Sequence, residues 1–250
     1  MNIVVAVKQI PDLQQVRIKN SQPVFDGVPY ALSLIDKNAL EAALQLKEAT
    51  GNNLMVVSVG NEEVEETVKE ALAAGADEAY LLLNNDLTNL ESSQSAVLLA
   101  ALIKKIDDVG IVIFGEGSGD NYSGQVGPRV AEILELPEVG YASRIEIGGS
   151  TATVIRSLED SDEILEAKLP LVVTVLGDIN EPRIPSVTQI LKAGKKPKQI
   201  FDIDDLGLDV PPKSVNTISN RAPENERKRL PVKSVDELLA ALKAEGFVGR

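Results

Sequence analysis

Short apolar runs alternate with helical patterns along the first half of the chain. The continuous runs suit buried strands, and the segments between them place apolar residues three and four positions apart. Such alternation predicts strand–helix units that build a parallel sheet covered on both faces. We therefore expect an α/β fold with a Rossmann-like, doubly wound, mostly parallel sheet. The runs are Ile3–Val7, Ala39–Leu46, Leu54–Val59, Val64–Leu72, Ala79–Leu83, Ala96–Ile106, Ile111–Phe114 and Val126–Leu136.

From Tyr141 onward the pattern changes to strands without long helices between them. Gly148-Gly149 is a hairpin signal between the first two strands. An antiparallel extension of the sheet is therefore predicted. The strands predicted after Tyr141 are Ala142–Ile147, Thr151–Ser157, Glu163–Ala167 and Leu171–Val175.

Helix ends are marked by residues with capping chemistry. Asp36 is a plausible N-cap for the first long helix, and Gly75 stands where a C-cap glycine is expected. Glu62 and Glu63 place negative charge at a helix start, and Glu91 with the two serines that follow is expected to begin another helix.

The last fifty residues differ in composition from the rest of the chain. Residues 202–212 are acidic and end in proline, and residues 216–231 are polar and charged. Ser234 then caps an amphipathic helix that carries Leu238, Leu239 and Leu242. We predict an α/β domain over residues 1–200 and an extended C-terminal arm with a docking helix over residues 201–250. The arm would dock either on its own domain or on a partner subunit.

A glycine-rich loop, Gly115–Ala131, lies directly between an apolar strand and a helix. Its glycines allow sharp turns and bring backbone N–H groups close to an anion, and the following helix points its positive N-terminal end at the same place. Side chains of Asp120–Ser123 offer hydrogen bonds to ribose or phosphate. The loop indicates a nucleotide site, although an ordinary strand–helix turn with an Asx-turn has the same pattern.

Two further strand ends point to the same edge of the predicted sheet. Ala6 ends the first strand and is followed by Lys8, and Val59-Gly60 ends another strand. The carboxyl ends of parallel strands converge at the switch point of an open sheet, so these junctions and the glycine-rich loop predict one crevice.

Composition excludes several kinds of chemistry. The chain has 250 residues, 38 acidic against 25 basic, a formal net charge of −13, and neither cysteine nor histidine. Thiol nucleophiles, serine–histidine–aspartate triads and the usual zinc and haem ligand sets are therefore absent, and we expect no catalytic side chain and no metal site. The acidic balance disfavours nucleic acid, and the lack of a signal peptide or a long apolar stretch predicts a cytoplasmic protein without membrane insertion.

Several segments together resemble the beta subunit of electron-transfer flavoprotein. The loop GEGSGD departs from the form common elsewhere in that family and resembles the Fix-type (FixA-like) subgroup. The matching segments span nearly the whole chain. They are Ile3–Asp12, Ser33–Glu48, Val56–Glu63, Ala71–Leu82, Gly115–Pro128 and Ile179–Pro197.

The resemblance implies a heterodimer whose alpha subunit carries most of a redox FAD. The beta subunit would add a wall near that flavin and bind its own adenine nucleotide, either AMP or a second FAD in electron-bifurcating members. At Ser33-Leu34-Ile35 this chain departs from the common Asn-Pro-Phe, so the identity of the nucleotide stays open. The implied cofactor contacts are Ala6, Ser33, Leu34, Ile35, Asp36, Val59, Asp120, Asn121, Tyr122, Ser123, Gly124, Gln125, Val126, Gly127, Pro128, Arg129, Val130 and Ala131.

A second implied site is a recognition loop at about residues 184–198. Val187 matches the apolar anchor that inserts into a partner dehydrogenase, beside a cluster of lysines that on charge alone would be a solvated turn. The implied partner contacts are Val187, Ile190, Leu191, Lys192, Lys195 and Lys196.

The implied function is electron transfer between a flavin dehydrogenase and a quinone oxidoreductase or a ferredoxin-like protein, as part of a flavin-based oxidoreductase complex. The alternative is a homodimeric nucleotide-binding regulatory or stress-type module without redox function. A nucleotide-hydrolysing enzyme ranks last, because the sequence has no P-loop and no evident metal-binding cluster.

Overall fold

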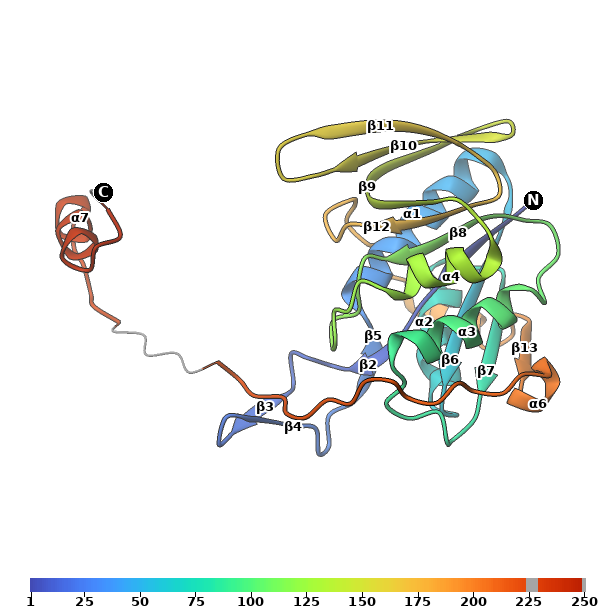
Figure 1. The fold of residues 1–250 in the computed structure, drawn as a ribbon, viewed down its shortest axis with the longest axis horizontal. Coiled ribbons are helices and arrows are strands. Elements are labelled where there is room, and N and C mark those ends of the chain that lie inside the picture. Colours follow the sequence, from blue (N-terminus) through green and yellow to red (C-terminus); the bar gives the residue numbers. More distant parts are fainter. Residues whose placement is uncertain (224–228, 249–250) are drawn as a thin grey trace. The chain divides into compact units, whose positions relative to one another are not determined.

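The computed structural model describes residues 1–223 and 229–248. The chain divides into two compact units, one formed by Met1–Arg17 with Phe25–Ile218 and the other by Ile18–Val24 with Ser219–Arg250 (Figure 1). Within the described residues, no helix has the length and apolar character that crossing a membrane requires.

The first unit is built on a nine-stranded sheet in the order β11-β10-β9-β12-β8-β1-β6-β7-β13. From β9 to β13 in this order each strand is parallel to the next, whereas β10 is antiparallel to both β9 and β11. The predicted Rossmann-like sheet with an antiparallel extension is confirmed (Figure 1). The strands are β1 (Asn2–Ala6), β6 (Asn53–Gly60), β7 (Glu78–Leu83), β8 (Val109–Gly115), β9 (Glu138–Gly148), β10 (Thr151–Ser157), β11 (Asp162–Lys168), β12 (Leu171–Val175) and β13 (Lys198–Phe201).

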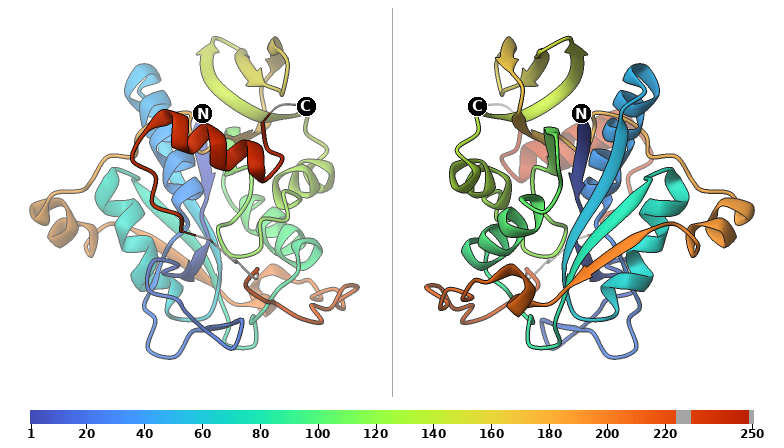
Figure 2. Two further views of the ribbon diagram at one scale, coloured as in Figure 1. Left: turned by 90° about the vertical axis from the view of Figure 1, so that its left-hand side faces the viewer. Right: turned by 90° about the vertical axis from the view of Figure 1, so that its right-hand side faces the viewer.

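Helices cover both faces of this sheet, as Figure 2 shows. One face packs α1 (Leu34–Thr50), α2 (Val64–Ala74) and α5 (Val187–Ala193), and the other packs α3 (Ser92–Ile103) and α4 (Val126–Leu134). The residues of strand β1 alternate between the two faces of the sheet. Ile3 and Val5 lie in the core on the α1 side, and Val4 and Ala6 lie in the core on the α3 side. A strand buried on both faces reads as the continuous apolar run seen in the sequence.

The winding of the chain reverses between β1 and β8. From β1 the chain passes through α1 to β6 on one side, and from β8 it passes through α4 to β9, which lies beyond β12 on the other side. Because α1 and α4 cover opposite faces, the chain continues from β1 and from β8 to opposite faces of the sheet. Open α/β sheets bind ligands at such a switch point.

Most predicted helix ends are confirmed, and one is wrong. Gly75 ends α2 with a positive φ of 140°, and Glu91 begins α3 through a capping box with Gln94. The N-cap of α1 is Ser33 and not Asp36, which lies inside the first turn. The Asp36 carboxylate instead accepts a hydrogen bond from the backbone N–H of Lys8.

Residues beyond 200 continue along the first unit. Strand β13 pairs with β7, and the short helix α6 (Ile203–Leu206) follows it. Partly buried side chains from this stretch pack on the α3 side of the core, which is why the compact unit extends to Ile218. They are Phe201, Ile203, Leu206, Leu208 and Val210. Two small antiparallel pairs were also not predicted: β2 (Gln9–Pro11) with β5 (Tyr30–Leu32), and β3 (Arg17–Lys19) with β4 (Gln22–Val24).

The second unit combines the β3–β4 ribbon with the end of the chain. The Ala222 N–H donates a 2.8 Å hydrogen bond to the Ser21 carbonyl. Helix α7 (Val235–Ala244) is capped by the Ser234 hydroxyl, as predicted, and has no buried residue. Residues 224–228 and 249–250 of the predicted arm lie outside the described residues.

Candidate functional site

Three of the predicted nucleotide-binding segments meet at the switch point. The Gly119 N–H, in the loop after β8, donates a 3.3 Å hydrogen bond to the hydroxyl of Ser33, the N-cap of α1. The Lys8 ammonium, just after β1, lies 2.7 Å from the Asp120 carboxylate of the same loop. The structure therefore brings together the end of β1, the start of α1 and the glycine-rich loop.

Asp36 is a buried carboxyl group at the base of this junction. Its Oδ2 atom accepts the Lys8 backbone N–H at 2.7 Å. Burial raises the pKa of Asp36 to about 7, against the opposing effects of that hydrogen bond and of the Lys8 charge. Close to neutral pH, this side chain therefore exists both as a carboxylate and as a neutral acid.

The Lys8–Asp120 ion pair bridges the junction. Burial alone would raise the pKa of Asp120, but the charge and hydrogen bond of Lys8 outweigh it and hold the pKa below its usual value. A phosphate at this place would compete with Asp120 for the Lys8 ammonium. An anion bound here would therefore have to displace Asp120 from Lys8.

At Gly115, where the glycine-rich loop begins, the backbone lies too close to α1 for a larger residue. A Cβ atom on Gly115 would stand 2.8 Å from both Asp36 Oδ1 and Ile35 Cγ2. Further along, Gly124 has a φ of 63° and Tyr122 a φ of 45°. The Tyr122 hydroxyl donates to Glu116 at 2.6 Å, which raises the pKa of Tyr122 to about 12 and helps fix the loop.

The N-terminal end of α4 supplies donors on the loop side. The first-turn N–H groups of Val126 and Gly127 have no acceptor within the helix, and Pro128 has no N–H to satisfy. Arg129 is exposed, and its guanidinium donates to the Gln125 side chain at 3.1 Å. Lys8 and Arg129 are the cationic side chains that these predicted segments offer to a phosphate.

The predicted cofactor residues divide into exposed and buried sets. Residues 120–125 are exposed, whereas Ala6, Val130 and Ala131 are buried in the core of the α3 and α4 side. The buried ones therefore hold the strand and helix in place and reach a ligand only through their backbone. Val59 stands at the end of β6, one strand beyond β1.

Sequence reasoning missed a cavity of about 120 Å³ on the far side of the loop. Glu138, Tyr141 and Arg156 line it from β9 and β10, together with Thr174. Burial raises the pKa of Glu138, and Arg156 opposes that rise. The positive φ of Tyr141, 60°, is visible only in the structure, and the surrounding sequence reads as an ordinary strand.

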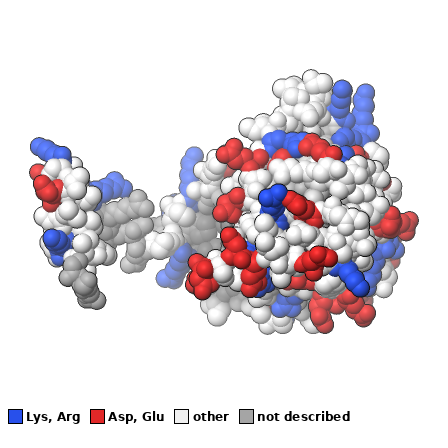
Figure 3. Space-filling view, turned by 90° about the horizontal axis from the view of Figure 1, so that it is seen from above, with Lys and Arg blue, Asp and Glu red and all other residues white. Residues whose placement is uncertain are grey.

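The predicted partner contacts lie on and after α5. Val187, Ile190 and Leu191 are exposed aliphatic side chains, and Lys192 and Lys195 are exposed beside them. Lys196 differs, because its ammonium donates to the carbonyls of Leu72 and Ala76 at 2.8 and 2.5 Å. Figure 3 shows acidic and basic side chains interspersed on the face that it draws.

Comparison with known proteins gives a consistent result. Residues 24–206 match the family described as "Electron transfer flavoprotein domain". A protein named electron transfer flavoprotein subunit beta, from Thermoanaerobacterium thermosaccharolyticum, is 40% identical over 84% of this chain and 81% of its own length. The caffeyl-CoA reductase-Etf complex subunit CarD of Acetobacterium woodii is 38% identical over 83% and 80% of the two chains. The electron transfer flavoprotein subunit beta of Bacillus subtilis is 34% identical over 99% and 100%.

Proposed function

The chain belongs to the electron transfer flavoprotein family as a beta subunit, and on that premise we propose that it pairs with an alpha subunit to carry electrons between a flavin dehydrogenase and a quinone oxidoreductase or ferredoxin-like protein. The chain itself would bind, position and shield the cofactors and would not carry out the redox chemistry, since it has neither cysteine nor histidine. A cytoplasmic location is part of this proposal.

We propose that the junction at the switch point binds an adenine nucleotide. The observation that carries this step is the meeting of Lys8, Ser33 and the glycine-rich loop beside the N-terminal end of α4. The N–H groups of Val126 and Gly127 would face the phosphates, and Lys8 and Arg129 would supply positive charge. The exposed side chains of residues 120–123 would contact the ribose.

The nucleotide is either AMP or FAD. AMP would be a structural ligand, whereas a bound FAD would supply redox chemistry and make the heterodimer a candidate for electron bifurcation. The Fix-type resemblance of the GEGSGD loop favours FAD. The replacement of the common Asn-Pro-Phe by Ser33-Leu34-Ile35 removes an amide from the site and leaves AMP as the second candidate.

The partner dehydrogenase would dock on the exposed aliphatic side chains of α5. A small apolar tip with lysines at its rim suits a transient contact with an acidic surface, in which charge sets the association rate. Lys192 and Lys195 are exposed for this purpose, whereas Lys196 is engaged with α2.

The decisive experiment is to produce the chain together with the alpha subunit of the same organism and to extract the nucleotides of the purified complex. A heterodimer with one FAD and one AMP supports the proposal without bifurcation, and two FAD per heterodimer support the bifurcating form. Electron transfer is then measured with flavin-dependent acyl-CoA dehydrogenases, a class suggested by the caffeyl-CoA reductase complex of the Acetobacterium relative. A flavin-free homodimer would instead favour the regulatory module.

A further inference from the structure

The exposed tip of α5 has few means of holding its own shape. Val187 and Leu191 are each 74% exposed, and Ile184, just before the helix, is 93% exposed. Helix α5 has seven residues and begins with a capping box between Ser186 and Gln189, but helices of this length are not stable in water by themselves. The geometry of the tip must therefore come from the segments on either side of it.

On the N-terminal side, Arg183 fastens the chain to α1. Its guanidinium donates to Glu41 through Nε at 2.7 Å and Nη2 at 2.9 Å, and its backbone N–H donates to Glu41 at 3.2 Å. A third guanidinium nitrogen, Nη1, donates to Glu48 at 2.6 Å. Glu41 and Glu48 lie two helical turns apart on one side of α1, so a single arginine spans both carboxylates.

The Glu41 carboxylate makes this contact specific. Only 7% of its side chain is exposed, whereas that of Glu48 is 59% exposed. Burial alone would raise the pKa of Glu41, but the hydrogen bonds from Arg183 outweigh it and lower the pKa. A buried charge needs a partner, and a guanidinium fork matches both carboxylate oxygens where a lysine would meet one.

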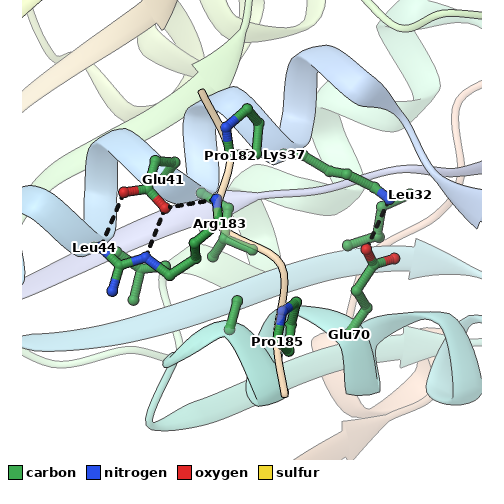
Figure 4. Close-up of a pocket in the computed structure, with 10 residues that line it drawn as sticks. Leu32, Lys37, Glu41, Leu44, Glu70, Pro182, Arg183 and Pro185 are labelled. Atoms are coloured by element: carbon green, nitrogen blue, oxygen red, sulfur yellow. Dashed lines mark hydrogen bonds and ion pairs between the residues drawn. The ribbon is translucent and has the colours of Figure 1, made fainter. Parts of the chain in front are cut away.

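Two prolines restrict the backbone around Arg183. In Figure 4, the segment that contains Pro182 and Pro185 crosses between α1 and α2. The Arg183–Glu41 hydrogen bonds lie on one side of this segment, and the Lys37–Glu70 ion pair lies on the other. Proline fixes φ, so the direction in which the chain leaves Arg183 towards Val187 is narrowly defined.

On the C-terminal side, the segment is fastened to α2. Ala193 is buried in the core, and Lys196 donates to two carbonyls at the C-terminal end of α2, where a cation is favoured. Lys198 forms a 2.6 Å ion pair with Glu65 of the same helix. The tip is therefore held between an arginine anchor on α1 and lysine anchors on α2.

We propose that Arg183, through Glu41, is a positioning residue that fixes the α5 tip in the orientation in which the partner dehydrogenase docks. This inference rests on the proposed function and adds to it a residue that is outside the predicted nucleotide and partner contacts. Loss of the anchor should weaken docking and leave the electron-transfer rate within the formed complex unchanged, because the tip would lose orientation before binding and recover it on binding at an entropic cost.

The test uses the full-length heterodimer and a flavin-dependent acyl-CoA dehydrogenase at increasing concentration. For Arg183→Gln, the dehydrogenase concentration at half-maximal rate should rise about tenfold, a change that corresponds to about 1.4 kcal/mol, while the maximal rate stays within about twofold. Hydrogen exchange of residues 187–193 in the free heterodimer should accelerate, and that of β1 and β8 should not. Arg183→Lys should restore part of the affinity.

Two further variants make the outcomes distinguishable. Val187→Ala with Leu191→Ala removes the apolar side chains of the tip, and Arg144→Gln removes an exposed arginine that pairs with Glu146 elsewhere on the surface. Weaker docking of the tip variant and of Arg183→Gln, with Arg144→Gln unchanged, supports the inference. If the tip variant weakens docking while Arg183→Gln changes neither docking nor exchange, the inference is overturned and the proposed function stands. If neither the tip variant nor Arg183→Gln alters docking, the docking part of the proposed function fails, and the inference fails with it.

Discussion

At the scale of single residues, the candidate nucleotide site depends on groups whose charge is set by burial. Asp36 has a folded-state pKa of about 7 against 3.8 for an ordinary aspartate, because it is buried. The Lys8 backbone N–H and the Lys8 charge oppose this rise, and Asp120 adds to it. The folded protein therefore binds a proton at Asp36 that the unfolded chain releases between pH 4 and pH 7.

This predicts a decline of stability with rising pH. The contribution of Asp36 is fully present below about pH 4 and is lost as the pH rises through about 7, at about 1.4 kcal/mol per pKa unit. In Asp36→Asn, the free energy of unfolding should fall less between pH 5 and pH 7.5 than in the wild type. Urea unfolding at several pH values measures this, and an identical decline in both proteins would contradict it.

A second residue-scale prediction concerns Gly127 in the first turn of α4. A Cβ atom at this buried position would lie 2.5 Å from Thr174 Cγ2. Gly127→Ala should therefore destabilise the protein by about 1–3 kcal/mol, although alanine is the better helix former.

The control for this prediction is Thr174→Ser, which deletes the methyl group in question and keeps the hydroxyl that accepts the Tyr141 N–H. In the double variant the cost of Gly127→Ala should largely disappear. Denaturant unfolding of the two single variants and the double variant gives the coupling energy. A coupling energy near zero would show that the contact does not cause the loss.

At the scale of elements, the sequence predicts those parts that periodicity or local chemistry determines. Doubly buried strands, the Gly148-Gly149 hairpin and the caps at Gly75, Glu91 and Ser234 follow from residue type and spacing. The meeting of the end of β1, the start of α1 and the glycine-rich loop was also predicted, because switch-point topology brings strand ends together.

What sequence did not predict depends on long-range packing. Strand β13 is four residues long and acquires its conformation by pairing with β7. Asp36 resembles an N-cap in sequence, but its carboxylate instead accepts a hydrogen bond from the backbone N–H of Lys8, 28 positions away. Lys196 resembles its exposed neighbours, and only the fold places its ammonium at the end of α2. Such long-range contacts do not produce a periodic pattern in the sequence.

Glu91 links two elements and allows a prediction about the start of the C-terminal segment. Its carboxylate caps α3 and also accepts the N–H groups of Ser214 and Val215 at 3.1 and 2.9 Å. Hydrogen bonds from Ser93 and Ser214 lower the pKa of Glu91 to about 2. Its contribution is therefore present above about pH 4.5 and is lost as the pH falls towards 2.

We expect Glu91→Gln to loosen the segment that passes over α3. Hydrogen exchange at Ser214 and Val215 should accelerate at pH 7, because an amide offers one weaker acceptor oxygen where the carboxylate offers two. Glu132→Gln on α4, an exposed position, is the matched control. Unchanged exchange at both amides in Glu91→Gln would show that the rest of the segment holds itself in place.

At the scale of the whole molecule, the two units differ in how much they bury. The first unit contains both hydrophobic cores, whereas α7 in the second has no buried residue and exposes Leu238 and Leu239. Exposed leucines on an amphipathic helix are typical of a surface that a partner covers. The first unit thus has the means to fold by itself, and the second has the character of a docking arm.

This division predicts that the arm is needed for pairing and not for folding. A chain ending at Ile218 should keep cooperative thermal unfolding with a midpoint within a few degrees of the full chain, since the cores remain intact. It should lose most of its affinity for the alpha subunit in a co-purification assay.

Leu238→Asp with Leu239→Asp in the full-length chain tests the same surface without truncation, because charged residues should abolish apolar docking at α7. Asp236→Asn, on the same helix, is the matched control. Undiminished co-purification of the leucine variant would exclude α7 as the docking element, and a large fall in the midpoint of the shortened chain would show that the first unit depends on the arm for its own stability.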